Sequence, residues 1–318
     1  MRRYSAYVYA AGHFLVDFFC ALFLISRQPP AYAFILYNFC AFAMQFPIGL
    51  LADTLGYNRG FALAGVLLVF TSLLPTPLPL QVTLVGLGNA CYHIGGGREA
   101  LLSGNRFTGL GFFVSPGAVG IFLGTLWAGK TAAHITCAVL LLILIFFLVA
   151  FCDNKRMIRK PKSGQPRIAA AMLAVVVLRS VVGLSMLTPW KTGVFITIGA
   201  LAGALGKFLG GAAADIFGAD RAGVISLLLA AVLFCFPDSA AAGVLAVLLF
   251  NMTMPITLGK ASQALPGFEG TAFGLLTFGL FLGYLPSVVG CSLSGVVSVL
   301  LTLLSAAILL LNRRNQNV

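Results

Sequence analysis

The sequence predicts an all-α membrane protein with twelve transmembrane helices in two pseudo-symmetric six-helix bundles. Of the 318 residues, 60% are hydrophobic and only 9% are charged, whereas a soluble domain carries about a quarter charged residues. Most of the chain lies in continuous apolar runs near the ~20 residues that a helix needs to cross a bilayer, without the alternation of barrel strands. A short polar stretch also occurs twice, which indicates two similar halves.

The apolar runs define the individual spans. The first run is interpreted as a span and not as a signal peptide, because His13 and Asp17 lie inside it and no small-residue cleavage site follows. The third and ninth runs are short. The expected spans are 7–26, 31–52, 61–75, 80–102, 107–127, 131–152, 168–188, 192–213, 222–236, 239–258, 271–290 and 291–311.

The longest polar segment, 153–167, divides the spans into two sets of six. It predicts a basic cytoplasmic linker between an N-terminal bundle, 1–152, and a C-terminal bundle, 168–318. Basic residues gather in every second connection, which places both termini in the cytoplasm of a cell (plasma or inner) membrane. The net charge of +12 therefore reflects topology, and we expect no nucleic-acid partner.

Two copies of one polar turn relate the two halves. GLLADTLGYNRG begins at Gly49 and GAAADIFGADR begins at Gly211, each between two apolar runs. Each copy is therefore expected at the end of a transmembrane helix. Five residues recur 162 positions later: Gly49, Ala52, Asp53, Gly56 and Arg59 return as Gly211, Ala214, Asp215, Gly218 and Arg221.

The first copy resembles the loop 2–3 signature of the major facilitator superfamily of transporters, and the second resembles its weaker counterpart between spans 8 and 9. The resemblance extends over the whole chain, including the six plus six spans and the basic central loop. It implies that Asp53 joins the cytoplasmic end of the second helix to the neighbouring half, so that both copies take part in gating. Helix N-termini and Arg59 are expected to stabilise this carboxylate, and Gly49 to permit close helix approach. Thr54, Tyr57 and Asn58 stand where the family often has basic residues.

Shorter matches refine the resemblance. GFFVSPGAVG, residues 111–120, is similar to the G-x-x-x-G-P-x-x-G-G signature of antiporters in the superfamily, although a serine and a valine replace two of its glycines. Pro116 is accordingly expected to be a gating residue. HFLVD, residues 13–17, and YHI, residues 92–94, resemble the first and fourth spans of the fosmidomycin-resistance type of exporter.

Charged side chains occur near the middle of spans 1 and 7, where a charge costs about 2.5–3.5 kcal/mol. Asp17 and Arg179 are 162 residues apart and so occupy equivalent positions in the two halves. His13 lies one helical turn before Asp17, on the same face. We expect Asp17 and His13 to carry a proton, with Arg179 as the opposing charge. A structural ion pair between Asp17 and Arg179 is the alternative.

Amide and imidazole groups occupy spans 4 and 10. Asn89 and His93 are one turn apart, and Asn251 follows Asn89 at the repeat offset of 162 residues. In the superfamily, spans 1, 4, 7 and 10 line the central cavity. The resemblance therefore implies that Arg179, His93, Asn89 and Asn251 contact substrate, and interhelical hydrogen bonding is the alternative role for both asparagines.

These observations predict a secondary active transporter that moves a small organic molecule by alternating access, in proton-coupled antiport or export. The alternatives are uptake or facilitated diffusion of a small organic anion, and a non-transporting sensor or scaffold with the same fold. The expected partners are a small-molecule substrate, protons and the lipid bilayer, and the chain is expected to be a monomer. No enzymatic activity, cofactor or metal site is expected, because the seven cysteines are scattered singly and no metal-ligand or nucleophile–base spacing occurs.

Overall fold

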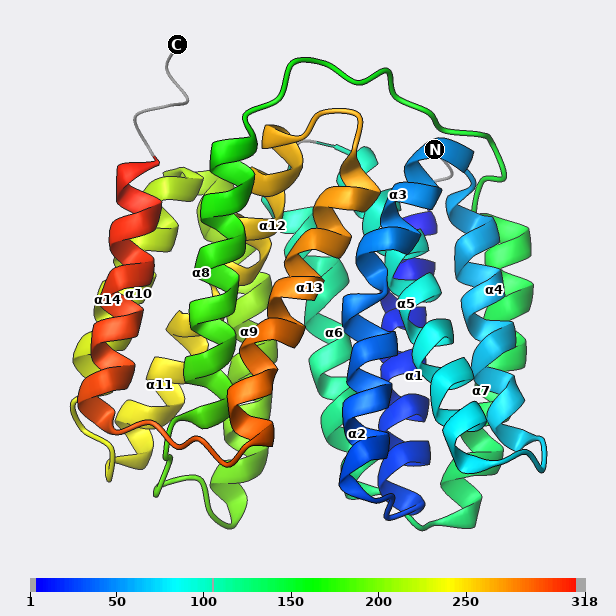
Figure 1. The fold of residues 1–318 in the computed structure, drawn as a ribbon, viewed down its shortest axis with the longest axis horizontal. Coiled ribbons are helices and arrows are strands. Elements are labelled where there is room, and N and C mark those ends of the chain that lie inside the picture. The colour runs from blue at the N-terminus through cyan, green and yellow to red at the C-terminus, as the bar shows by residue number, and fades with distance from the viewer. Residues whose placement is uncertain (1–3, 105, 313–318) are drawn as a thin grey trace. The chain divides into compact units, whose positions relative to one another are not determined.

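The computed structural model describes residues 4–104 and 106–312. Within these residues the chain is helical, apart from connections and one isolated bridge between Met186 and Leu293. Each predicted span corresponds to a helix, or to helical pieces that follow one another directly (Figure 1). Long apolar runs form helices in a membrane because only intrahelical hydrogen bonds satisfy the backbone there.

The first half of the sequence forms seven α-helices and two short η segments. In order they are α1 (Ser5–Ser26), α2 (Ala31–Asn38), the π-helical η1 (Phe39–Ala43), α3 (Gln45–Leu55), α4 (Asn58–Phe70), the 3₁₀ segment η2 (Thr71–Leu73), α5 (Leu78–Leu102), α6 (Phe107–Leu126) and α7 (Thr131–Phe151).

The second half of the sequence forms seven further α-helices. They are α8 (Pro166–Ser185), α9 (Val194–Phe217), α10 (Ala219–Leu233), α11 (Ala240–Asn251), α12 (Thr253–Ala264), α13 (Glu269–Val288) and α14 (Gly295–Leu311).

Eight helical segments among the described residues are long and apolar enough to cross a membrane. Asn58–Leu73 and Gly295–Leu311 are shorter apolar helices. The eight segments are Ser5–Ser26, Ala31–Leu55, Phe107–Leu126, Thr131–Phe151, Pro166–Ser185, Val194–Phe217, Ala240–Ala264 and Glu269–Val288.

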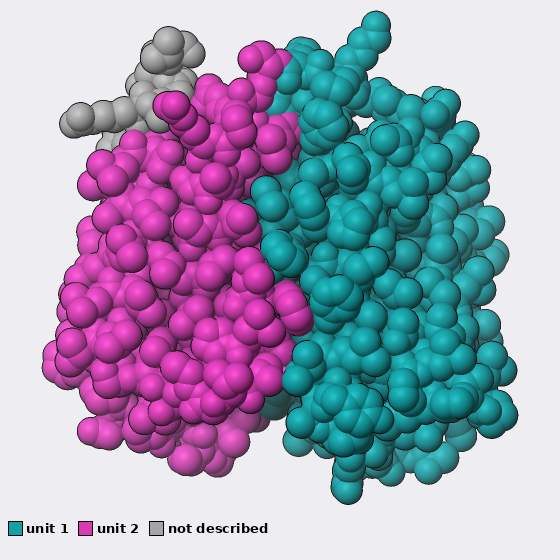
Figure 2. All heavy atoms as spheres, viewed as in Figure 1, with its two compact units in different colours: residues 1–104, 116–162, 266–278 teal, residues 105–115, 163–265, 279–318 magenta. Residues whose placement is uncertain are grey.

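Contacts between residues divide the chain into two compact units, which Figure 2 shows in two colours. Unit 1 comprises residues 1–104, 116–162 and 266–278, and unit 2 comprises residues 105–115, 163–265 and 279–318. The helices α6 and α13 therefore contribute residues to both units. The assignment of 1–152 and 168–318 to two pseudo-symmetric bundles stays a prediction.

Small residues determine how closely helices approach within unit 1. A Cβ atom added to Gly65 on α4 would lie 2.5 Å from the backbone nitrogen of Tyr92 and 2.6 Å from the carbonyl oxygen of Gly88, both on α5. No real Cβ tolerates such distances, so the two backbones are in contact. This packing fixes α5, which carries Asn89 and His93.

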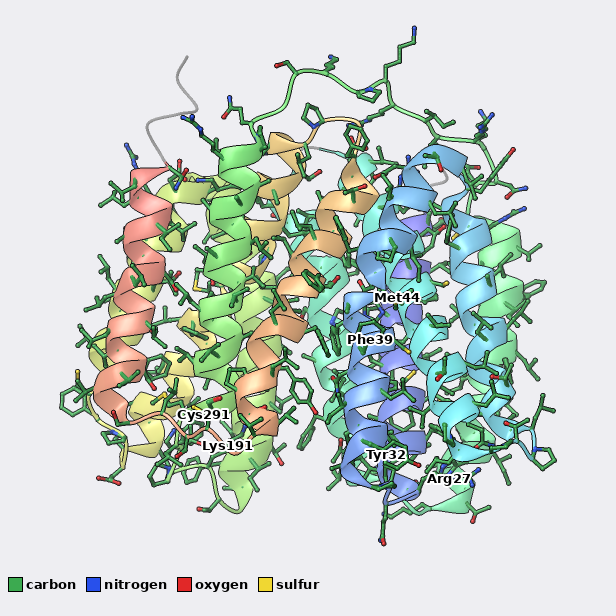
Figure 3. The ribbon with its side chains drawn as sticks, viewed as in Figure 1. Arg27, Tyr32, Phe39, Met44, Lys191 and Cys291 are labelled. Carbon is green, nitrogen blue, oxygen red and sulfur yellow. The ribbon has the colours of Figure 1, made fainter. Side chains whose placement is uncertain are left out.

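Two of the predicted spans are interrupted, in each case just before a proline. The π-helical turn Phe39–Ala43 lies between α2 and α3 and ends four residues before Pro47 (Figure 3, where Phe39 and Met44 are labelled). Met252 separates α11 from α12, three residues before Pro255. A proline has no N–H for the carbonyl four residues earlier and its ring crowds that turn, which accounts for both interruptions.

Candidate functional site

A buried carboxylate in unit 1 lies between two histidines. Asp17 on α1 is 6% exposed, and its Oδ2 is 3.2 Å from Nε2 of His13, one turn earlier on the same helix. Its Oδ1 is 3.6 Å from Nε2 of His93 on α5, and Asn89 on α5 donates to the same oxygen through Nδ2 at 2.8 Å. Four of the residues predicted from the sequence thus converge, and we call His13, Asp17 and His93 the triad.

The orientation of His93 defines which of its nitrogens carries hydrogen. Its Nδ1 lies 2.8 Å from the carbonyl oxygen of Asn89. A carbonyl oxygen only accepts, so Nδ1 is the donor of this bond and Nε2 faces the carboxylate of Asp17. In a neutral imidazole that nitrogen presents a lone pair, which a carboxylate repels. A cation between Nε2 and Asp17, whether a proton or a metal ion, makes the arrangement favourable.

The triad is also closely packed. The rings of His13 and His93 are 4.3 Å apart between centroids and nearly perpendicular, at 81°. Gly117 on α6 faces them, because an added Cβ there would overlap Nε2 of His13 and Oδ2 of Asp17. The signature around Pro116 thus supplies a glycine next to the triad, a role that the sequence pattern alone did not reveal. Pro116 itself lies inside α6 without ending the helix.

The polar residues predicted in unit 2 have different surroundings. Arg179 on α8 is 7% exposed, donates from Nη2 to the carbonyl oxygen of Phe250 at 2.9 Å, and lies 5.0 Å above the Phe250 ring. That carbonyl is next to the interruption at Met252, and Thr253 also donates to it at 2.9 Å. Asn251 donates to the carbonyl of Val247, one turn earlier. Unlike Asn89, Asn251 forms no side-chain hydrogen bond to a charged group within the part of the chain that the structure describes.

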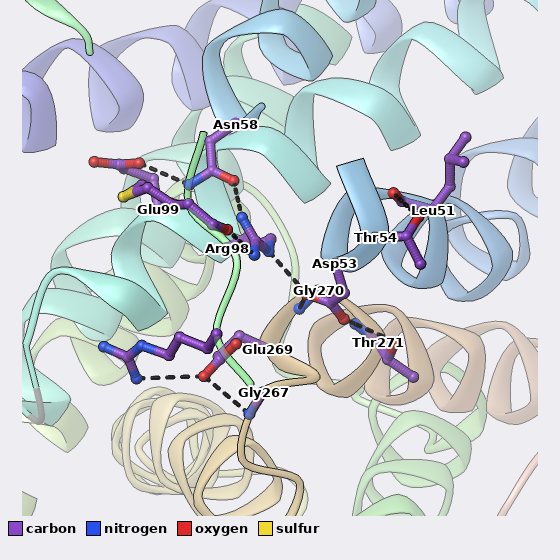
Figure 4. A network of polar contacts seen from close by, with 12 residues as sticks. Leu51, Asp53, Thr54, Asn58, Arg98, Glu99, Gly267, Glu269, Gly270 and Thr271 are labelled. Atoms are coloured by element: carbon purple, nitrogen blue, oxygen red, sulfur yellow. Dashed lines mark hydrogen bonds and ion pairs between the residues drawn. The ribbon is translucent and has the colours of Figure 1, made fainter. Parts of the chain in front are cut away.

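The first copy of the repeated turn forms a buried network in unit 1 (Figure 4). Asp53 at the end of α3 accepts from the backbone nitrogens of Gly270 and Thr271 and from the Thr271 hydroxyl, each at 2.8 Å. These donors are at the N-terminus of α13, where unpaired N–H groups favour a carboxylate. Gly49 permits this approach, since an added Cβ would overlap the Gly270 carbonyl.

The cation beside Asp53 is Arg98 and not Arg59, which corrects one expectation. The Nε of Arg98 donates to Oδ1 of Asp53 at 2.8 Å, and Arg98 is fully buried (Figure 4). Arg59 instead donates to the carbonyls of Val149 and Cys152 at the end of α7, both at 3.1 Å. Arg59 lies at the start of α4, beside the C-terminus of α7. The carbonyl groups at that helix end lack intrahelical partners and attract the positive charge of Arg59.

Arg98 also binds two groups that the sequence-based reasoning did not assign to a site. Its Nη1 donates to Oδ1 of Asn58 at 2.6 Å and its Nη2 to the carbonyl of Met157 in the linker. Asn58 in turn donates to Glu99 at 2.7 Å. The offset of 162 residues between the two halves offers a sequence signal for this cluster. Asn58 corresponds to Asp220 and Arg98 corresponds to Lys260, so both halves carry a polar residue and a basic residue at these positions.

The second copy of the turn forms a related but more exposed arrangement in unit 2. Asp215 at the end of α9 accepts from the backbone nitrogens of Phe107 and Thr108, at 2.9 and 2.8 Å, and from the Thr108 hydroxyl. A Cβ on Gly211 would overlap the Phe107 carbonyl, as at Gly49. Lys260, which is 1% exposed, pairs with Asp220, whereas Arg221 is exposed.

Both glycines that end the helices before these turns have positive φ angles, and Gly56 is in the left-handed helical conformation. Gly56 follows α3 with φ of +77°, and Gly218 follows α9 with φ of +89°. Residues with a Cβ rarely adopt this conformation, and a helix commonly ends on such a glycine. The repeated glycines therefore have a structural role, and their part in gating stays a prediction.

Comparison with known proteins connects this arrangement to transporters. No family model matches the chain, and no curated protein matches its sequence. Solved structures match over nearly the full length of both chains. The fucose:proton symporter FucP of E. coli has 12% identity and a TM-score of 0.67, covering 98% of this chain and 97% of its own.

Two further structures show the same likeness. A bacterial homologue of the iron transporter ferroportin, in the outward-facing state with soaked iron, has 14% identity and a TM-score of 0.68, covering 98% of this chain and 99% of its own. The human organic anion transporter MFSD10 (TETRAN) has 14% identity and a TM-score of 0.69, covering 97% and 98%.

These neighbours share the fold of major facilitator superfamily transporters, which the chain therefore also has. The predicted all-helical, multi-pass membrane fold is confirmed. The names of these neighbours are those of transporters. The likeness to the fosmidomycin-resistance type stays a prediction.

Proposed function

We propose that this protein is a secondary active transporter that moves a small organic molecule across the cell membrane by alternating access, exporting it in exchange for protons. The observation that carries the proposal is the buried Asp17, held between His13 and His93 in a fold whose solved neighbours are transporters. A carboxylate inside a membrane protein is costly and marks ion or substrate pathways. FucP, a proton symporter, has this fold.

In this proposal the residues of the two units have separate tasks. Asp17 and His13 carry the proton, since their side chains are in direct contact. His93 and Asn89 face substrate in unit 1, and Arg179 and Asn251 do so in unit 2. The repeated turns gate the movement, with Asp53 at the N-terminus of α13 and Asp215 at the N-terminus of α6. We further propose that the chain acts as a monomer with both termini in the cytoplasm.

Substitution of Asp17 tests the coupling. Purified protein is reconstituted into vesicles that contain a pH-sensitive dye, and small organic acids, sugars and antibiotics are added one at a time. We expect the parent chain to move protons in response to at least one compound, and Asp17→Asn to lose that response. His134→Gln is the matched control, because His134 is the third histidine and lies one turn from the Lys130 carbonyl, to which its Nδ1 is bonded. Coupling by Asp17→Asn at the parent's rate would contradict the proton assignment, and a parent chain without any flux would favour a sensor or scaffold.

A second candidate is transport of a small organic anion, and Arg179 favours it. Among the described residues, its guanidinium is held by a carbonyl and an aromatic ring, and Nε has no hydrogen-bond partner. A buried cation without a carboxylate is suited to an anionic ligand. Organic anions are also the substrates named for MFSD10. An anion transporter should lose substrate binding in Arg179→Ala and Arg179→Lys, whereas a proton antiporter should retain substrate binding and lose proton coupling.

A further inference from the structure

The triad has the composition and geometry of a metal site. We infer that His13, Asp17 and His93 bind one divalent transition-metal ion, of which Zn²⁺ and Co²⁺ are representative. Each residue offers one ligand atom, and the three atoms lie within 4.8 Å of one another. All three residues are at least nine-tenths buried. Two of the three histidines in the chain therefore converge on one carboxylate.

The distances between ligand atoms agree with those around a small cation. Bonds of about 2.0–2.1 Å at tetrahedral angles separate neighbouring ligand atoms by about 3.3 Å. The observed separations are 3.2 Å between His13 Nε2 and Asp17 Oδ2, and 3.6 Å between His93 Nε2 and Asp17 Oδ1. These two distances involve different oxygens of Asp17, and the three ligand atoms, which lie within 4.8 Å of one another, would draw closer together around a bound ion.

The groups that hydrogen-bond to the ligand residues from outside the site are of the kind that stabilise a metal-bound histidine. The Nδ1 of His93 donates to the Asn89 carbonyl, which fixes the tautomer and directs the Nε2 lone pair at Asp17. Asn89 also donates from Nδ2 to Oδ1 of Asp17 and so holds the carboxylate in place. One asparagine thus orients two of the three ligands from outside the site.

The donor set selects the class of ion. Two imidazole nitrogens and one carboxylate suit Zn²⁺, Fe²⁺, Co²⁺ and similar ions, whereas Ca²⁺ and Mg²⁺ prefer oxygen ligands alone. Three protein ligands leave a fourth position open to water or to a ligand of the metal. Gly117 leaves space beside His13 and Asp17, which a side chain at that position would fill.

This inference goes beyond the proposed function and does not depend on it. The ion is a second occupant of the triad, and its binding is measured without transport. Failure of the metal experiment would leave proton-coupled transport as proposed, and absence of transport would leave the metal site intact.

The test is a titration of metal-free, tag-free protein in detergent with Co²⁺, followed in the visible spectrum, and with Zn²⁺, followed by calorimetry. We expect one ion per chain and the d–d absorption of a four- or five-coordinate Co²⁺ with nitrogen and oxygen ligands. Asp17→Asn, His13→Gln and His93→Gln should each lose stoichiometric binding, and His134→Gln should retain it. Asn89→Ala should weaken binding by about 10–100-fold, as expected for a group that orients ligands.

Two alanine variants on α6 distinguish a blocked metal site from a misfolded protein. Gly117→Ala introduces a methyl group beside the triad and should abolish binding with all ligands present. Gly109→Ala, in the same helix, introduces one where nothing lies within 4 Å and should bind like the parent. The inference is overturned if the parent binds no ion, if binding survives in His93→Gln and Asp17→Asn, or if the Co²⁺ spectrum shows thiolate charge-transfer bands from the cysteines.

Discussion

At the scale of single residues, the network of unit 1 depends on the shape of one guanidinium. Arg98 donates from three different nitrogens to Asp53, Asn58 and the Met157 carbonyl. A planar group with donors in a fixed fork can do this, whereas an ammonium is a compact point charge. The equivalent position in unit 2 is Lys260, which pairs with the carboxylate of Asp220. The two copies thus differ in how firmly they are bonded.

Asp53→Asn tests how much the Asp53 carboxylate contributes to the stability of the protein. The change removes the carboxylate that pairs directly with the buried Arg98, so we expect a loss of about 3–5 kcal/mol in the free energy of unfolding. Asp215→Asn is the matched control. Because Asp215 is exposed, its removal should cost only about 1 kcal/mol. Chemical unfolding in detergent measures both, and equal losses would contradict the difference that we assign to burial.

Arg98→Lys tests the shape of the donor at constant charge. The lysine can still pair with Asp53 but cannot also reach Asn58 and the Met157 carbonyl in the same geometry. We expect a loss of about 1.5–3 kcal/mol in the free energy of unfolding, since hydrogen bonds to charged groups are of that size. Unfolding of Lys260→Arg provides the comparison in unit 2. If Arg98→Lys leaves the free energy of unfolding unchanged, the positive charge alone stabilises the network.

At the scale of elements, the helices end where local residues require it. Gly56 and Gly218, both with positive φ, end α3 and α9, and the π-helical turn before Pro47 interrupts the second span. Part of the linker is bonded to the end of α3. The backbone nitrogen of Met157 donates to the Gly56 carbonyl at 2.8 Å, and Arg156 donates to the Leu55 carbonyl at 3.1 Å. The linker thus covers the orphan carbonyls at the end of α3.

Gly56→Ala tests this helix end. The left-handed backbone costs about 1–2 kcal/mol in a residue with a Cβ, and the new methyl group would also lie 2.9 Å from Ile158. We expect a lower thermal unfolding temperature than in the parent chain. Gly60→Ala, in the first turn of α4, meets only Tyr57 at 3.5 Å and should leave the temperature unchanged or slightly raised. Equal behaviour of the two variants would contradict the assigned role of the backbone angle.

At the scale of the whole molecule, the length of the hydrophobic runs predicted the helices well, because a membrane-spanning segment must satisfy its backbone hydrogen bonds internally. The prediction at 271–290 corresponds to α13 at Glu269–Val288. The interruption at 39–43 was not predicted, because mean hydropathy does not reveal where a proline leaves a carbonyl without its N–H partner. Arg98 was not assigned to the site from the sequence, because its partners Asn58 and Met157 lie 40 and 59 residues away. Spacing along one helix found His13 and Asp17, and only the fold brought His93 to them.

The predicted orientation can be tested with thiol labelling. Cys235 and Cys291 are the exposed cysteines among the seven, and both follow helices whose ends are predicted to face outwards. A membrane-impermeant maleimide added to intact cells should label the parent chain and fail to label the variant with Cys235→Ala and Cys291→Ala. Labelling of inverted vesicles in preference to intact cells would show that the orientation is reversed.

The constant offset of 162 residues has a consequence for construction of new chains. It relates Asp53 to Asp215, Gly56 to Gly218, and Arg98 to Lys260, so no net insertion or deletion separates the two copies over this stretch. A gene that encodes the first half twice in tandem would keep every turn and helix end in register without added or removed codons. Expression of this tandem repeat would show how much of the sequence difference between the two halves is needed for the protein to assemble in a bilayer.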